Sequence, residues 1–173
     1  YSSIEAVMKS DCVAALLITD RMIPEVTDNK THDKAVIVYR PKSLVAGMGC
    51  RKGVPADHLE ELLTSAFDAN DLSLDSLSCI ATAELKRDEP GLLELAKKYG
   101  VPIHCYSADE LNSVFDPASE PASGAGEGKS LATARPRVHN LLGVWGVAEP
   151  SALLAAGSQE LLAPRTNTEK ATI

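Results

Sequence analysis

Aromatic side chains are scarce in this sequence, making up only 4% of its 173 residues. Proteins that bind single-stranded nucleic acid use aromatic rings as stacking platforms, so the shortage disfavours that class. Positive charge is also in the minority, because 17 Lys and Arg residues stand against 24 Asp and Glu residues. The resulting net charge of −7 argues against nucleic acid or an anionic membrane as a partner. An anionic ligand would therefore need a locally basic pocket.

The chain also lacks the patterns of a metal site, a disulfide scaffold or a membrane helix. Its four cysteines, at positions 12, 50, 79 and 105, form no C-x-x-C pair, so we predict no metal site and reduced thiols in a cytoplasmic protein. No apolar run approaches the roughly 20 residues that a membrane helix requires. The sequence begins with Tyr1 rather than Met and shows no signal-peptide pattern, so we expect a longer natural chain upstream.

Apolar runs alternate with amphipathic segments along the chain, which predicts a three-layer α/β/α sandwich around a mixed, largely parallel sheet. The unbroken apolar run at 13–18 indicates a strand covered on both faces. Further strands are predicted at 35–39, 43–46, 77–83, 102–106, 160–163 and 171–173. Helices are predicted to begin near Pro55, Pro90, Ser107 and Pro150. Residues 116–137 are rich in Pro, Ala, Ser, Gly and Glu, and we predict a mobile loop there.

Local signals define several of these helices more closely. The helix after Pro55 has an apolar face, formed by Leu59, Leu62, Leu63, Ala66 and Phe67. Gly100 follows the helix from Pro90 at the position where a left-handed cap is favoured. Ser107 and Glu110 have the spacing of a capping box, in which each side chain bonds a free backbone amide of the other.

The turn at 47–53 leads from a strand into a helix and is the first candidate site. Gly47 and Gly49 allow the backbone to approach a ligand closely, while Arg51 and Lys52 add positive charge. The glycine spacing departs from the dinucleotide and P-loop fingerprints, which disfavours a nucleotide site. A sharp structural turn is the alternative interpretation.

Cys50 is a candidate nucleophile in the same turn. Cations and a helix start lower the pKa of a thiol and so favour the reactive thiolate. However, no His or acid is placed beside Cys50 by the sequence. An inert cysteine remains the other interpretation.

Two further turns carry charged residues directly before a helix. Lys86 could hold a carboxylate arm of a ligand, and Glu89 could act as a general base, although helix capping would also account for Glu89. In the turn at 143–149, Gly143 and Gly146 allow a close backbone approach, and Glu149 lies near a helix start. Trp145 in that turn is either a flat ligand contact or a core residue, and His139 is the one histidine worth testing.

Four segments together resemble the C-terminal domain of cobalamin-biosynthesis protein G and its stand-alone relative CobE. They are Gly-Met-Gly-Cys-Arg-Lys-Gly at 47–53, Ala-Glu-Leu-Lys-Arg-Asp-Glu-Pro-Gly-Leu-Leu-Glu-Leu-Ala at 83–96, Tyr-Ser-Ala-Asp-Glu-Leu at 106–111 and Gly-Val-Trp-Gly-Val-Ala-Glu at 143–149. Residues 44–173 are thereby identified as this domain. Residues 1–43 resemble part of the central region of the longer G protein.

The resemblance implies a role in corrin-ring synthesis, as part of a cobalt-precorrin-5A hydrolase that opens a δ-lactone and releases acetaldehyde. It implies a cobalt-precorrin or related corrinoid as ligand, with cobalt present only in the substrate and no cofactor. Other pathway enzymes, or the family's N-terminal domain, are implied as partners. Either Glu89 or Glu149 would be the base. The alternative functions are a CobE-like module that binds a corrin intermediate without catalysis, and a generic nucleotide-binding domain. Whether the chain alone is an active enzyme is left open.

Overall fold

The computed structural model describes residues 11, 13–23, 30–31, 34–114 and 146–173. The loop predicted at 116–137 lies outside the described residues, as do Gly143, Trp145 and His139. Within the described ranges, no helix has both the length and the apolar character needed to span a bilayer.

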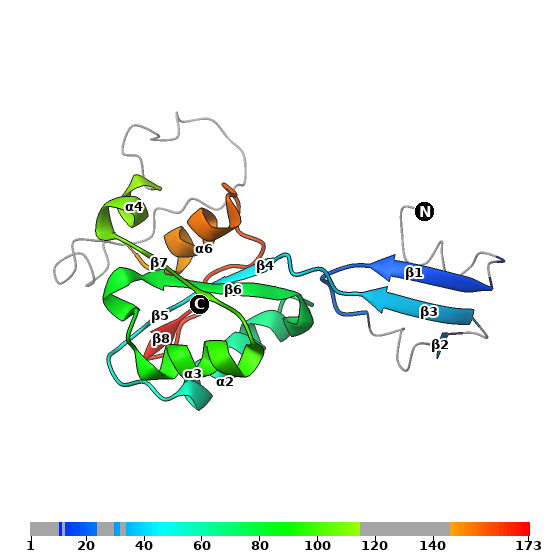
Figure 1. Cartoon of the computed structure of the whole chain (residues 1–173), viewed down its shortest axis with the longest axis horizontal. Coiled ribbons are helices and arrows are strands. Elements are labelled where there is room, and N and C mark those ends of the chain that lie inside the picture. The colour runs from blue at the N-terminus through cyan, green and yellow to red at the C-terminus, as the bar shows by residue number, and fades with distance from the viewer. Residues whose placement is uncertain (1–10, 12, 24–29, 32–33, 115–145) are drawn as a thin grey trace.

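A parallel sheet of three strands, in the order β4-β6-β7, forms the centre of the fold (Figure 1). Its strands are β4 (Leu44–Gly47), β6 (Leu77–Ala83) and β7 (Ile103–Tyr106). A short 3-10 turn, η1 (Leu74–Ser76), leads into β6, and another, η2 (Glu84–Lys86), follows it. These strands were all predicted from their apolar runs, and their parallel pairing is confirmed.

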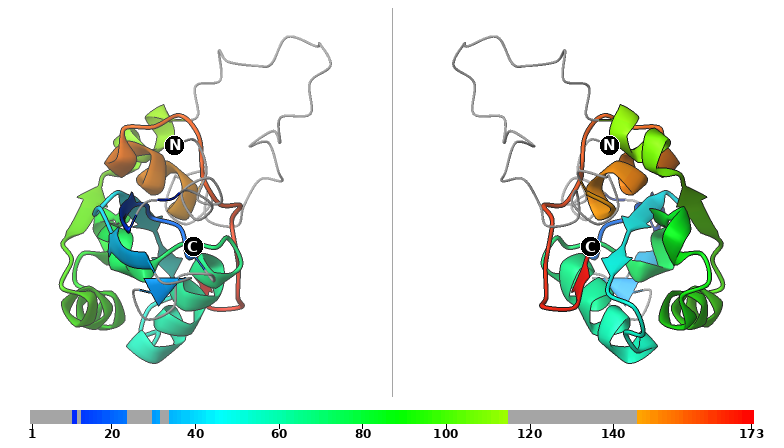
Figure 2. Two further views of the ribbon diagram at one scale, coloured as in Figure 1. Left: turned by 90° about the vertical axis from the view of Figure 1, so that its right-hand side faces the viewer. Right: turned by 90° about the vertical axis from the view of Figure 1, so that its left-hand side faces the viewer.

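Helices cover both faces of this sheet (Figures 1 and 2). On one face lie α2 (Ala56–Asp68) and α3 (Pro90–Tyr99), and on the other lie α4 (Ala108–Ser113) and α6 (Ala148–Ala156). The main core fills the space between the sheet and the α2–α3 pair, where the predicted apolar face of α2 is buried. The α/β prediction, with helices on both faces of a parallel sheet, is therefore confirmed.

The helix boundaries follow the local signals in the sequence. Gly100 ends α3 in the left-handed region, with φ of 63°, and both hydrogen bonds of the Ser107–Glu110 capping box are present at α4. Helix α6 begins at Ala148, two residues before the predicted start at Pro150. Backbone amides in the first turn of a helix have no intrahelical partner, so a proline, which lacks an amide hydrogen, fits anywhere in that turn. A proline therefore does not identify the first residue of the helix.

A second sheet, in the order β1-β3-β2, comprises β1 (Ala14–Ile18), β3 (Lys34–Tyr39) and β2 (Lys30–Thr31). The predicted strands β1 and β3 pair in parallel. The expectation that the first strand is covered on both faces is wrong, because Leu16 and Ile18 are exposed. Four of the five residues of β1 are not fully buried, so an apolar run alone did not establish burial.

The β1-β3-β2 sheet is joined to the central body through the segment that follows β1. The amide of Met22 donates to the carbonyl of Asp71 at 2.7 Å, and the amide of Ser73 donates to the carbonyl of Asp20 at 2.8 Å. In addition, the guanidinium of Arg21 donates to the carbonyl of Asn70 at 2.9 Å. The strands thus divide among separate sheets instead of forming the single sheet that was expected.

A two-stranded antiparallel ribbon joins β5 (Gly49–Cys50) to β8 (Ala171–Thr172) near the C-terminus. The predicted glycine loop at 47–53 is therefore partly strand, with Met48 between the two strands and a turn at Lys52 and Gly53. The final strand candidate is confirmed, whereas the one at 160–163 is wrong. A short apolar run forms a strand only where its backbone finds a ladder partner, and this segment instead lines a pocket beside α6.

Candidate functional site

A pocket of about 260 Å³ brings together residues from the three predicted turns. Cys50 and Arg51 come from the first turn, Lys86 from the second, and Gly146 and Glu149 from the third. The C-terminal segment closes the remaining side with Arg165, Thr168, Glu169, Lys170, Ala171 and Thr172. We call this the basic pocket, because its walls carry four cationic side chains and only two carboxylates. It supplies the local positive charge that the acidic chain as a whole lacks.

Lys86 and Glu89 form an ion pair beside this pocket. The ammonium of Lys86 lies 3.4 Å from Oε2 of Glu89, and these side chains are only 17% and 7% exposed. The other carboxylate oxygen, Oε1, accepts a hydrogen bond from the amide of Gly53. Glu89 thus ties the first turn to the second, while Lys86 reaches the pocket wall. Glu89 itself is not among the residues that line the pocket.

The environment of Cys50 opposes thiolate formation. Burial raises the pKa of its thiol above the ordinary value, Lys86 acts to lower it, and Glu89 adds to the increase. The sequence-based expectation counted the cations but not the burial or the acid. Cys50 as a nucleophile stays a prediction, and it now lacks the electrostatic support on which it was based.

Glu149 lies in the first turn of α6 and pairs with Arg165 across the pocket wall. The two charged groups are 4.0 Å apart, and both side chains remain partly exposed. Amides in the first turn of a helix have no intrahelical partner and can donate to an oxyanion. Arg165 was missed at the sequence level, because no motif marks the segment that follows α6.

Hydrogen bonds to backbone carbonyls hold the pocket walls in place. Thr82 Oγ1 donates to the carbonyl of Met48 at 2.7 Å, and Ser151 Oγ donates to the carbonyl of Ala81 at 3.1 Å. The amide of Arg51 donates to the carbonyl of Lys170 at 2.8 Å, which fastens the C-terminal segment to the first turn. The pocket is therefore built on β6, α6 and the β5–β8 ribbon.

The glycines and the lysine of the first turn have different environments. A Cβ at Gly47 would overlap the carbonyl oxygen of Ala148, so a glycine is needed for β4 and α6 to approach closely. Gly49 lines the basic pocket, whereas Gly47 does not. Lys52 is exposed and also lies outside the residues that line the pocket. The ligand-binding roles of Gly47 and Lys52 stay predictions without a place in this pocket.

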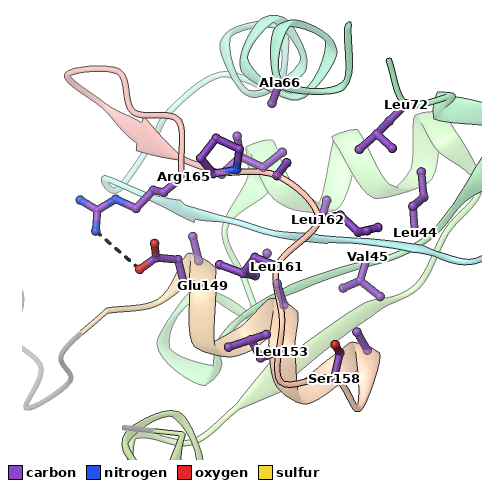
Figure 3. Close-up of a pocket in the computed structure, with 18 of the residues that line it drawn as sticks. Leu44, Val45, Ala66, Leu72, Glu149, Leu153, Ser158, Leu161, Leu162 and Arg165 are labelled. Atoms are coloured by element: carbon purple, nitrogen blue, oxygen red, sulfur yellow. Dashed lines mark ion pairs between the residues drawn. The ribbon is translucent and has the colours of Figure 1, made fainter. Parts of the chain in front are cut away.

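A second, larger pocket of about 430 Å³ lies between β4, α2, α6 and the segment after α6 (Figure 3). Apolar side chains such as Leu44, Leu153 and Leu161 form most of its labelled wall (Figure 3). Glu149 and Arg165 line both pockets, so their ion pair stands at the boundary between them. Among the described residues, no cluster of three or more His, Cys, Asp or Glu side chains is arranged to hold a metal ion.

Comparison with known proteins gives a consistent result. The family model for the cobalamin synthesis G C-terminus matches residues 44–173. The cobalt-precorrin-5A hydrolase of Priestia megaterium is 33% identical over the whole of this chain, and the chain spans 42% of its length. The protein CobE of a Sinorhizobium species is 29% identical over 69% of each chain. A crystal structure of CobE, a protein from the cobalamin biosynthetic pathway, superimposes with a TM-score of 0.57 and 28% identity, covering 74% of this chain and 84% of its own.

Proposed function

This chain belongs to the cobalamin synthesis G C-terminal family, and we propose that it works in corrin-ring synthesis as part of a cobalt-precorrin-5A hydrolase. The observation that supports this most is the basic pocket, where Arg51, Lys86 and Glu149 meet from three separate turns. Corrin precursors carry many carboxylate arms, and cationic side chains with free helix amides are suited to hold them. The ligand of this pocket is accordingly a cobalt-precorrin or a related corrinoid.

The size of the pocket limits what enters it. Sites that enclose whole drug-sized ligands measure about 300–1,000 Å³, and the basic pocket measures about 260 Å³. It therefore accepts one peripheral arm, or the lactone ring, while the macrocycle stays outside. The rest of the macrocycle would contact the apolar side chains of the larger, neighbouring pocket or further polypeptide. Further polypeptide is available in the hydrolase relative, because this chain spans 42% of its length.

Glu149 is the better placed of the two candidate bases, because it lines the pocket and Glu89 does not. A water oxygen attacks the lactone carbonyl carbon while Glu149 takes the water's proton. The tetrahedral intermediate then breaks its bond to the ring oxygen. A carboxylic acid, which ionises, forms on one side, and the departing alkoxide takes the proton back from Glu149 as a hydroxyl. Release of acetaldehyde follows when that hydroxyl gives its proton to the Glu149 carboxylate and its oxygen forms a carbonyl. The carbon–carbon bond to the macrocycle breaks at the same time, with its electron pair passing into the ring.

Stabilisation of the oxyanion falls to Lys86 and to the amides of Ala148 and Glu149. All three residues line the same pocket, and donors aimed at a developing negative charge are worth about 10²–10³-fold in rate each. Glu89 has a positioning role in this scheme. It holds the ammonium of Lys86 and the amide of Gly53, and so keeps two of the three turns together.

The test is turnover of cobalt-precorrin-5A, measured by acetaldehyde release, for the chain alone and for the chain mixed with the remainder of the P. megaterium relative. We expect Glu149→Gln to lower the rate by about 10²–10⁴-fold, the range for loss of a general base. The control is Glu61→Gln, which changes an exposed carboxylate on α2. Unchanged turnover in the double variant Glu89→Gln, Glu149→Gln would exclude both carboxylates.

A corrinoid-binding module without catalysis is the second candidate. The similarity to CobE favours it, because that match covers 69% of CobE itself and therefore most of a short protein. Absorbance titration with a hydrogenobyrinate-like corrinoid separates the two candidates. Tight binding that depends on Arg51 and Lys86, with no acetaldehyde released in either mixture, would select the module.

A cytoplasmic location and assembly with other pathway enzymes or further family polypeptide are part of the same proposal. The described cysteines Cys50, Cys79 and Cys105 are all free thiols, which fits a reducing compartment. Separation of the cell contents into soluble and membrane fractions would test the location.

A further inference from the structure

The β1-β3-β2 sheet, whose strands are drawn in Figure 1, has an apolar face that the described chain leaves bare. The parallel register places Leu16 beside Ile37 and Ile18 beside Tyr39. All four side chains are exposed: Leu16 by 61%, Ile18 and Ile37 by 66% each, and Tyr39 by 58%. Because residues two apart on a strand point to the same side, the four form one continuous patch. We call this patch the bare sheet face.

The opposite face of the same strands is covered. Leu17 and Val36 alternate with the residues of the bare sheet face, are 8% and 1% exposed, and pack with Ile23. All-parallel sheets occur almost only with both faces covered, usually by helices. In this mixed sheet β1 and β3 pair in parallel, while β2 pairs with β3 antiparallel. A bare apolar face on a parallel pair is therefore typical of an interaction surface.

The relatives indicate what covers it. The family model begins at residue 44, after β3, so the bare sheet face lies outside the family's C-terminal domain. The P. megaterium hydrolase matches the whole chain, including β1 and β3, and this chain spans only 42% of it. The match with CobE covers 69% of this chain and 69% of CobE. A smaller share of CobE than of the hydrolase therefore lies outside the match. The strands β1 and β3 are thus matched in a relative that has more than half of its length outside the match.

We propose that the bare sheet face docks an amphipathic helix from the polypeptide that the longer relatives carry outside the matched region. The helix would place a stripe of aliphatic side chains on Leu16, Ile18, Ile37 and Tyr39 and so cover the second face of the sheet. Hydrogen bonds from Met22 and Ser73 fasten this sheet to the body that holds the basic pocket. Docking therefore places the additional polypeptide in a defined position relative to that pocket.

The test uses the full 173-residue chain and the recombinant remainder of the P. megaterium relative, mixed and measured by isothermal titration calorimetry. We expect saturable 1:1 binding, with at least a tenfold loss of affinity in the double variant Leu16→Gln, Ile37→Gln. Both side chains are exposed, so the variant retains its fold, which circular dichroism checks. The matched control is Leu93→Gln, an exposed leucine on α3, and it should bind like the unchanged chain.

Three results would overturn the proposal. One is the absence of binding, and a second is equal binding by the double variant. The third is concentration-dependent dimerisation of the chain alone that the double variant abolishes, because the face would then belong to a second copy. Slower hydrogen exchange in β1 and β3 on mixing would support the helix. None of these measurements involves a corrinoid, so their outcome is independent of the proposed hydrolase function.

Discussion

At the scale of single residues, the candidate site depends on how charged groups share their partners. The Glu89 carboxylate accepts hydrogen bonds from the amide of Gly53 and the ammonium of Lys86, and its side chain is nearly inaccessible to solvent. An isolated buried carboxylate would be costly, and the two partners offset that cost. Glu89 also lies close enough to Cys50 to affect its titration. The structure therefore gives Glu89 a supporting role that its position before a helix did not reveal.

The reactivity of Cys50 toward iodoacetamide provides a test at this scale. Burial raises the pKa of the Cys50 thiol, so its alkylation should be slow at neutral pH and accelerate only at clearly alkaline pH. Removing the negative charge with Glu89→Gln should lower this pKa, whereas Lys86→Met should raise it further, because Lys86 opposes the shift. Mass spectrometry of the peptide that contains Cys50 follows the reaction separately from the other cysteines. A thiol already fully reactive at neutral pH would contradict the assignment.

At the scale of elements, the close contact between β4 and α6 positions the third turn. Gly47 faces the carbonyl of Ala148, and Ser151 ties α6 to β6 through the carbonyl of Ala81. This contact sets where Glu149 enters the basic pocket, one residue after Ala148. The glycine of the first turn thus acts through packing, and the site depends on it indirectly.

Replacement of Gly47 by alanine should destabilise the fold, because the added methyl group overlaps a backbone oxygen that can move only with α6. Overpacking of this kind costs about 1–3 kcal/mol. Gly49→Ala is the matched control, since its Cβ would lie 3.4 Å from the Val147 side chain, which is close to ordinary contact. Urea unfolding measures the free energy of unfolding of both variants. Equal stability of the two variants would show that α6 adjusts without cost.

At the scale of the whole molecule, an acidic chain carries a locally basic pocket. The net charge is −7, whereas the cavity is lined by the cations Arg51, Lys86, Arg165 and Lys170 and by the carboxylates Glu149 and Glu169. Glu89 pairs with Lys86 behind the cavity wall. Attraction of the proposed carboxylate-rich ligand would therefore be local. This attraction would act over a short range and be weakened by the surrounding negative charge.

Corrinoid affinity should consequently fall as salt is added, because the screening length decreases from about 10 Å at 0.1 M to about 3 Å at 1 M ionic strength. The comparison of Arg51→Met with Lys52→Met locates the effect. These residues are adjacent in sequence, but only Arg51 lines the basic pocket. We expect Arg51→Met to weaken binding severalfold and to reduce the salt dependence, with Lys52→Met close to the unchanged chain. Equal effects of the two variants, measured by absorbance titration, would argue for diffuse attraction.

Local patterns predicted much of the fold and part of the site. The apolar face of α2, the cap at Gly100 and the Ser107–Glu110 box were all correct. The structure brings Cys50, Arg51, Lys86, Gly146 and Glu149 from the three predicted turns to the wall of one pocket, while Gly143 lies outside the described residues. Their roles in binding and catalysis stay predictions. The exposure of β1 and the absence of a strand at 160–163 were not predicted.

The sequence by itself determined the helices, the parallel strands and the family, because caps, periodicity and motifs are read over a few neighbouring residues. Only the tertiary structure decided that Arg165 and Lys170 complete the basic pocket and that Glu89 stands behind Lys86. It also decided that one face of β1 and β3 is bare. Arg165 and Lys170 lie far along the chain from the turns they meet, and Glu89 is held by the amide of Gly53, 36 residues away. Contacts and burial of that kind leave no mark in a local pattern.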